Sequence, residues 1–152
     1  MGIVPNFSLA DIRKHLEKAQ NRIDKAVIQV LRRLGELCVA EARENGGYTD
    51  QTGNLRSSIG YVIVVNGRIV ENVFSEANKD EGAKGESTGR SYAETLAKNY
   101  SGGYVLIVVA GMSYAASVES KSKNVLTSAE KYAGKKLPKM LEQLKKNIDK
   151  MK

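Results

Sequence analysis

The feature that most constrains the fold is a long helical pattern near the N-terminus. Apolar residues recur at alternating spacings of three and four, as Leu9, Ile12, Leu16, Ala19, Ile23, Ala26 and Val30, which is the pattern of one helix face. Ser8 is a good N-cap, with Asp11 three residues on, and Gly46-Gly47 favours a helix end. About 36 residues at ~1.5 Å each span about 54 Å. A compact domain of 152 residues is only about 30 Å across, so we expect part of this helix to contact a partner.

The apolar stripe widens along this helix. A second row joins it at Val27, Leu31, Leu34 and Cys38. We therefore expect residues 27–42 to be embedded in the core. Residues 9–26 carry only a thin seam, which we expect to project or to pack on a neighbour. The candidate oligomer interface consists of Leu9, Ile12, Leu16 and Ile23.

The remaining patterns predict a small sheet and a closing helix. Residues 61–65 and 68–74 are rich in β-formers and flank Asn66-Gly67, the strongest short signal for a hairpin with a type I′ turn. Residues 104–110 are almost wholly apolar, as in a central strand covered on both faces. A last helix is expected over 129–150, with a kink or restart at Pro138. The fold class is thus α+β: one domain over 1–152, in which the long N-terminal helix and the C-terminal helix pack on a small, mainly antiparallel sheet.

Two segments are predicted to be flexible. Residues 75–89 are polar and rich in glycine, which is typical of a mobile loop that is functional or ordered only on binding. A short helix is expected after it, over 91–100. Residues 1–7 precede the N-cap and are also expected to be flexible.

The charge balance favours anionic partners. The chain carries a net charge of +7, and lysines are concentrated towards the C-terminus. This pattern fits a solvated helix face that aids solubility, or a surface for nucleic acid or an acidic protein. The longest apolar stretches are too short to cross a membrane as helices. No signal peptide pattern is visible, which together with the single cysteine fits a reducing cytoplasm.

Residue types that carry catalysis or bind metals are scarce. His15 and Cys38 are the only histidine and the only cysteine, so a zinc site has no ligand set. On one helix they would lie about 34 Å apart, too far for a catalytic pair. No phosphate loop or dinucleotide fingerprint occurs. We predict no enzyme activity, cofactor, metal or small-molecule substrate; a small hydrolase with an unrecognised site is the remaining enzymatic alternative.

One polar segment joins the long helix to the hairpin: Thr52-Gly53-Asn54-Leu55-Arg56-Ser57-Ser58-Ile59. Gly53 is expected in a conformation that a Cβ disfavours. If residues 54–58 form a helical turn, Leu55 and Ile59 face the core together. Arg56 then points outward, either to solvent or towards an acidic neighbour or a DNA phosphate. Lys79 and Lys84 of the polar loop are candidates for the same kind of contact.

The order of these elements resembles the tail-component (neck, or tail-completion) family of long-tailed bacteriophages and their prophages. Its members carry a similar Thr-Gly-x-Leu-x-x-Ser-Ile segment after the first helix. They also carry a similar Tyr-Ala-x-x-Val-Glu segment after a central strand, here Tyr114-Ala115-Ala116-Ser117-Val118-Glu119. In many relatives a glycine-rich, aromatic loop follows. Residues 120–124, Ser-Lys-Ser-Lys-Asn, replace that loop here, so contacts made through it are not carried over.

The resemblance implies a structural role in virion morphogenesis and no catalytic residues. Copies would form a ring, hexameric in the particle, at the head–tail junction or the upper end of the tail, with DNA passing through it. Its partners would be further copies and other phage neck and tail proteins. The protein would be a virion component assembled in the bacterial host cytoplasm. The alternative from the residues is a basic nucleic-acid-binding module of a mobile element, whose binding would depend steeply on salt.

Overall fold

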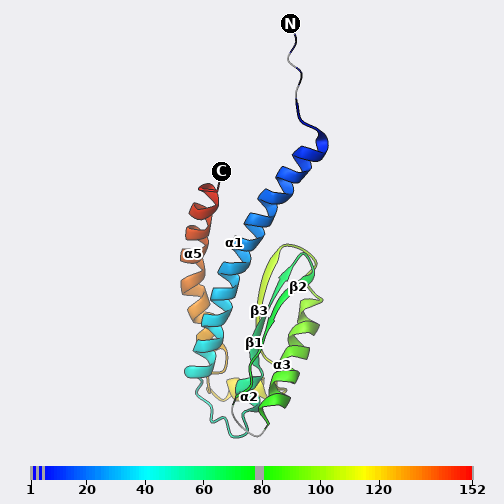
Figure 1. Ribbon diagram of the computed structural model, residues 1–152. Coiled ribbons are helices and arrows are strands. Elements are labelled where there is room, and N and C mark those ends of the chain that lie inside the picture. Colours follow the sequence, from blue (N-terminus) through cyan, green and yellow to red (C-terminus); the bar gives the residue numbers. More distant parts are fainter. Residues whose placement is uncertain (1, 3, 5, 78–80, 152) are drawn as a thin grey trace.

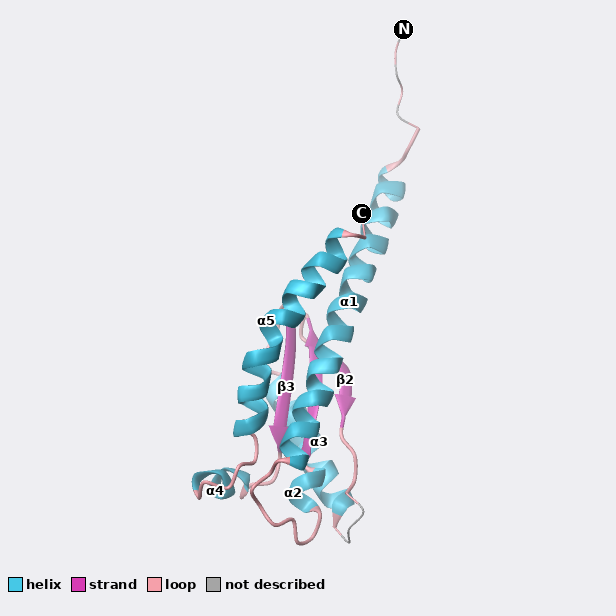
Figure 2. Ribbon diagram, turned by 90° about the vertical axis from the view of Figure 1, so that its left-hand side faces the viewer, coloured by secondary structure: helices cyan, strands magenta, loops and turns pink. Residues whose placement is uncertain are grey.

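The computed structural model describes residues 2, 4, 6–77 and 81–151 (Figure 1). A small sheet lies between α3 on one face and the α1–α5 pair on the other (Figures 1 and 2). The elements in chain order are α1 Leu9–Glu44, α2 Asn54–Ser57, β1 Ile59–Val65, β2 Arg68–Val73, α3 Gly82–Ala97, β3 Tyr104–Ala110, α4 Ala115–Ser120 and α5 Thr127–Asp149. The predicted α+β fold, with two long helices and a small antiparallel sheet, is confirmed.

Helix α1 has the predicted start and length. Its 36 residues begin with a capping box, in which the Ser8 hydroxyl accepts from the Asp11 N–H at 3.2 Å and the Asp11 carboxylate accepts from the Ser8 N–H at 3.0 Å. Leu34, Cys38 and Ala42 are buried, whereas residues 9–22 are all exposed. The division into an embedded half and a projecting half is therefore confirmed, as Figure 1 shows.

The sheet is antiparallel in the order β2-β1-β3. Asn66 and Gly67 have φ of 49° and 81°, so both central residues of the turn have the positive φ that type I′ requires. The prediction that residues 104–110 form the central strand is wrong, because β1 holds that place and β3 lies at an edge. The apolar run has another cause. Both faces of β3 are covered, Leu106 and Val108 packing towards α1 and α5 and Ile107 towards α3.

The prediction of a loop over residues 75–89 is wrong for residues 82–89, which are helical. Residues 82–89 form the first half of α3, and the predicted start of a helix at residue 91 is nine residues late. Gly82, Gly85 and Gly89 are buried and, with Ala93 and Ala97, recur at helical spacing. A Cβ at Gly85 or Gly89 would clash with the backbone of α2 or of Ser58. These glycines therefore mark a close helix contact, not a turn. Residues 78–80 lie outside the described residues.

Helix α5 runs antiparallel beside α1 (Figure 1). It continues through Pro138 without interruption, so the alternative of a restart there is wrong. Its apolar side contributes Ala129 and Leu144 to the interior, while Pro138 and the lysines are exposed. Between β3 and α5, residues 115–120 form the short helix α4.

Candidate assembly surfaces

The projecting half of α1 presents an apolar seam to solvent. The exposed fractions are 81% for Leu9, 40% for Ile12 and 65% for Leu16. Ile23 is only partly exposed, because it lies where α1 reaches the sheet. There the Tyr104 hydroxyl donates to the Asp24 carboxylate, which also accepts from Gln20 at 2.7 Å. Of the four predicted interface residues, Leu9, Ile12 and Leu16 are thus exposed to solvent, and Ile23 is partly buried.

The segment between α1 and β1 has the predicted geometry. Gly53 adopts φ of 82°, and α2 follows it directly. Leu55 and Ile59 are 3% and 0% exposed, which confirms that they face the core together. The buried Ser58 hydroxyl donates to the Leu55 carbonyl at 2.8 Å, and the Ser57 hydroxyl accepts from the Ala77 N–H at 2.7 Å.

Arg56 is exposed but also has a partner within the chain. Its Nη2 donates to the Arg43 carbonyl in the last turn of α1 at 2.8 Å. Arg43 itself donates to the carbonyls of Ile59 at 2.8 Å and Ser75 at 3.0 Å, and desolvation lowers the pKa of its guanidinium. Lys84 is exposed on α3, and Lys79 lies outside the described residues. A partner contact by these three residues stays a prediction.

The second of the two family motifs, Tyr114–Glu119, ends in a carboxylate that caps α5. Glu119 accepts from the N–H groups of Val125 at 2.8 Å, Leu126 at 2.9 Å and Thr127 at 3.3 Å, and from the Thr127 hydroxyl. Desolvation alone would raise the pKa of Glu119, but the bonds from Thr127 and the N–H groups outweigh it, so the pKa is lowered. The carboxylate thus satisfies the otherwise free donors at the start of the helix. Apart from the Tyr-Ala-x-x-Val-Glu segment itself, no pattern in the sequence predicts this cap.

The two family motifs, Thr52–Ile59 and Tyr114–Glu119, are far apart in sequence but meet at one end of the domain. The Gly111 N–H, just before the second motif, donates to the Ser58 carbonyl of the first at 3.1 Å. A Cβ at Gly111 would clash with the backbone of Gly89. Three backbones therefore pass each other at a distance that only glycine permits.

The comparisons with known proteins bear on this arrangement. The model of the family described as "Bacteriophage HK97-gp10, putative tail-component" matches residues 10–120. The chain belongs to this family. The match runs from the second residue of α1 to the end of α4, and so includes the seam from Ile12 onwards and both motifs. No curated protein and no solved structure matches the chain.

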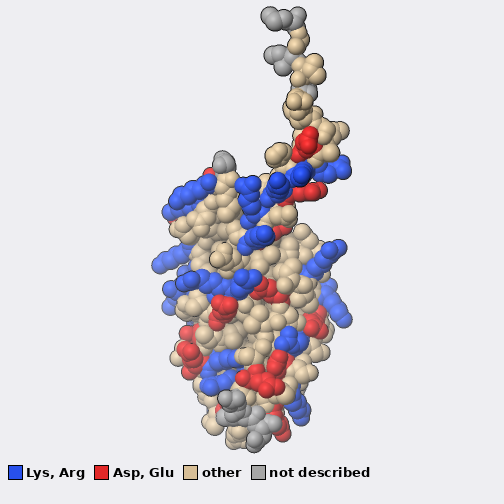
Figure 3. All heavy atoms as spheres, viewed as in Figure 1, with Lys and Arg blue, Asp and Glu red and all other residues tan. Residues whose placement is uncertain are grey.

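Positive charge on this family member is concentrated on its two long helices. Residues 11–33 and 131–150 hold 14 Lys and Arg against 5 Asp and Glu, whereas the rest of the chain holds two more acidic than basic residues. On the face drawn in Figure 3, Lys and Arg side chains gather over the upper parts of α1 and α5. The net charge of +7 therefore comes from these stretches of the two long helices.

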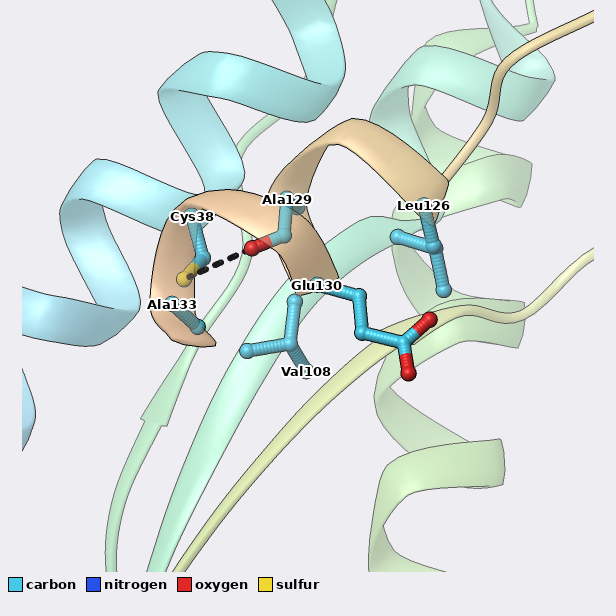
Figure 4. Close-up of a pocket in the computed structure, with 6 residues that line it drawn as sticks. All are labelled: Cys38, Val108, Leu126, Ala129, Glu130 and Ala133. Carbon is cyan, nitrogen blue, oxygen red and sulfur yellow. Dashed lines mark hydrogen bonds between the residues drawn. The ribbon is translucent and has the colours of Figure 1, made fainter. Parts of the chain in front are cut away.

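Cys38 lies beside a small cavity of about 260 Å³ between α1, α5 and β3. It is 2% exposed, and its thiol donates to the Ala129 carbonyl at 3.8 Å (Figure 4). Desolvation raises the pKa of the thiol, so the nucleophilic thiolate is disfavoured. The Glu130 carboxylate points away from the sulfur in Figure 4. Cys38 is a buried core residue, as its place on the apolar stripe predicts.

His15 is exposed on the projecting half of α1, far from Cys38 along the helix. Among the described residues, no group of three His, Cys, Asp or Glu side chains could hold a metal ion. Within the same part of the chain, no helix has both the length and the apolar character needed to cross a membrane.

Proposed function

We propose that this tail component forms a ring from copies of itself, hexameric in the particle, at the head–tail junction or the upper end of the tail. It would assemble in the host cytoplasm and contact other neck and tail proteins. The observation that carries the proposal is the bare half of α1, residues 9–22, with its exposed Leu9, Ile12 and Leu16. A contiguous apolar seam on a projecting helix is a surface that proteins normally cover.

The size of the seam sets how such copies associate. Burying a Leu or Ile side chain contributes about 1.5–3 kcal/mol. Weighted by the exposed fractions of Leu9, Ile12 and Leu16, the seam offers about 3–6 kcal/mol per interface. Association costs about 4–15 kcal/mol in lost translational and rotational freedom, so the seam alone does not hold a stable pair. Head-to-tail contacts that close into a ring give every copy two interfaces, which favours a closed assembly over isolated pairs.

The test is a double variant of the seam, Leu9→Ser with Leu16→Ser, because both side chains are well exposed in the single chain. Assembly should weaken while circular dichroism and the unfolding midpoint stay close to those of the wild type. Leu141→Ser is the matched control: Leu141 is 47% exposed on α5, outside the seam. Loss of the folded monomer in the double variant would show that the seam is ordinary core.

A second candidate function is nucleic-acid binding, favoured by the nine excess positive charges on residues 11–33 and 131–150. In the ring these residues would face DNA that passes through it. A basic nucleic-acid-binding module should show an affinity for duplex DNA that falls steeply with salt. Ring assembly should instead depend mainly on protein concentration. Replacing Lys135, Lys139 and Lys146 with Gln should reduce the salt slope if α5 contacts phosphates.

A further inference from the structure

We propose that the open edge of β3 receives the N-terminal segment of a second copy of this chain as an added strand. The proposal rests on the self-assembly proposed above and identifies a contact through which neighbouring copies would hold each other. It concerns a surface distinct from the seam of α1.

The backbone of β3 has one side unpaired. The Gly103 carbonyl accepts from the Asn66 N–H at 2.9 Å, and the Gly111 N–H donates to the Ser58 carbonyl. Strands β1 and β3 pair in a regular antiparallel register. The backbone N–H and C=O groups of the odd-numbered residues of β3 therefore bond β1, and those of the even-numbered residues point away from β1. The outward N–H and C=O groups thus belong to Tyr104, Leu106, Val108 and Ala110. No described residue bonds these outward groups.

The two edges of the sheet differ in protection. Strand β2 carries Arg68 and Glu71, and its pairing with β1 is interrupted by a register shift beside Ile63. Charges and bulges of this kind prevent other strands from pairing. Strand β3, Tyr104–Ala110, has no charge and no proline, and its register is uninterrupted. An unprotected apolar edge of seven residues is a template for strand addition.

A groove beside this edge can take the side chains of an added strand. It has a volume of about 370 Å³ and runs along residues 108–110 of β3. Its walls are Tyr92 and Leu96 of α3, Ala116 of α4, and Leu126 and Glu130 next to or in α5. In strand addition the main chain supplies the hydrogen bonds, and such apolar hollows select alternate side chains.

The N-terminal segment has the matching chemistry. Residues 1–8 contain no charged side chain, although 27% of the whole chain is charged. Val4 and Phe7 are 85% and 62% exposed. Val4 and Phe7 are three positions apart, so in an extended strand their side chains point to opposite faces. One would face the α3 wall of the groove and the other its α5 wall. Proline is tolerated in an edge strand where its nitrogen faces away from the ladder.

Distances exclude the chain's own groove as the receptor. Tyr104 bonds Asp24, so the start of β3 is level with that residue. From there α1 runs 15 residues away to Leu9, or about 22 Å. Val4 can return at most about 18 Å from Leu9, and Val108 lies roughly 14 Å further on along β3. The segment therefore reaches a groove only on another copy.

The test is disulfide trapping between full-length single-cysteine additions. Val4→Cys chains are mixed with mass-tagged chains carrying Tyr92→Cys or Glu130→Cys, one on each rim of the groove, and oxidised; native Cys38 stays buried. The control receptor is Leu141→Cys, an exposed site on α5 away from the groove. We expect mixed disulfides with the rim variants and not with Leu141→Cys, and their loss when Phe7→Asp is added to the Val4→Cys chain.

Sedimentation of the same samples separates the two proposals. Chains that assemble without rim-specific disulfides, or that trap Leu141→Cys equally well, overturn the strand-addition proposal and leave the ring in place. Chains that neither assemble nor trap overturn both. Rim-specific trapping that survives Phe7→Asp also overturns the proposal, because the apolar anchor would then not hold the segment.

Discussion

Replacing Gly85 with Ala should destabilise the fold, although alanine is the better helix former. The three atoms nearest to a Cβ at Gly85 would all be backbone atoms of Asn54, with the carbonyl carbon and Cα at 2.8 Å and the oxygen closer still. No side chain can rotate away, so α3 must move from α2. Overpacking of this kind costs about 1–3 kcal/mol, against a gain of about 1 kcal/mol in helix propensity. We expect a net loss of up to about 2 kcal/mol.

Gly134→Ala is the matched control for this variant. Gly134 lies in α5, and a Cβ there would meet nothing within 4 Å. Only the propensity term applies, so this variant should be more stable by about 0.5–1 kcal/mol. Urea unfolding followed by circular dichroism measures both. Equal stabilisation by the two alanines would show that α3 does not pack on α2 as closely as described.

Three further predictions concern side chains of the core and of the second motif. Leu55→Ala should cost about 2–5 kcal/mol in urea unfolding, because Leu55 is 3% exposed; a loss below that range would place it outside the core. The pKa of folded Glu119 is lowered, so its carboxylate stabilises the fold above the unfolded pKa and this stability is lost as pH falls through the folded pKa. Glu119→Gln should therefore flatten the stability profile at acid pH, and an unchanged profile would refute the cap. Desolvation raises the pKa of Tyr61 to about 12. The neutral Tyr61 therefore contributes stability that is fully present below the unfolded pKa of about 10 and is lost as pH rises through about 12. In an ultraviolet absorbance titration, Tyr61→Phe should remove the last tyrosine to ionise.

Local patterns predicted those parts of the fold that local chemistry controls. The capping box at Ser8, the Asn66-Gly67 turn and the positive φ of Gly53 each depend on a few adjacent residues. The pairing of Leu55 with Ile59 depends on a single helical turn. The apolar stripe of α1 widens towards its C-terminal end, because the core covers more of the helix surface there. The width of the stripe therefore distinguishes the embedded half from the projecting half.

Contacts between distant segments account for the errors. The glycine-rich, polar composition of residues 75–89 favours a loop, because glycine weakens an isolated helix. The close approach of α2 that requires glycine at position 85 is not visible locally. The apolar sequence of β3 indicates that both faces of the strand are covered. It does not indicate whether the strand has a neighbour on one side or on both, so the edge position of β3 was not predicted. The capping role of Glu119 depends on where α5 begins after the turn at residues 121–124.

The candidate surfaces divide in the same way. The exposed seam at Leu9, Ile12 and Leu16 was predicted because a stripe too narrow for a core is visible in the spacing alone. The roles of Arg56 and Lys84 depend on a partner, and neither sequence nor fold fixes them. The open edge of β3 could not be predicted, because it follows from the strand order.

The most direct test of the account is sedimentation equilibrium of the purified chain over a wide range of protein concentration. We expect the chain to associate with rising concentration into a closed oligomer of fixed size. The folded Leu9→Ser, Leu16→Ser variant should remain a monomer over the same range, and Leu141→Ser should associate like the wild type. A wild-type chain that stays monomeric throughout, or a seam variant that assembles as well as the wild type, would contradict the claim that the projecting half of α1 joins copies of this protein.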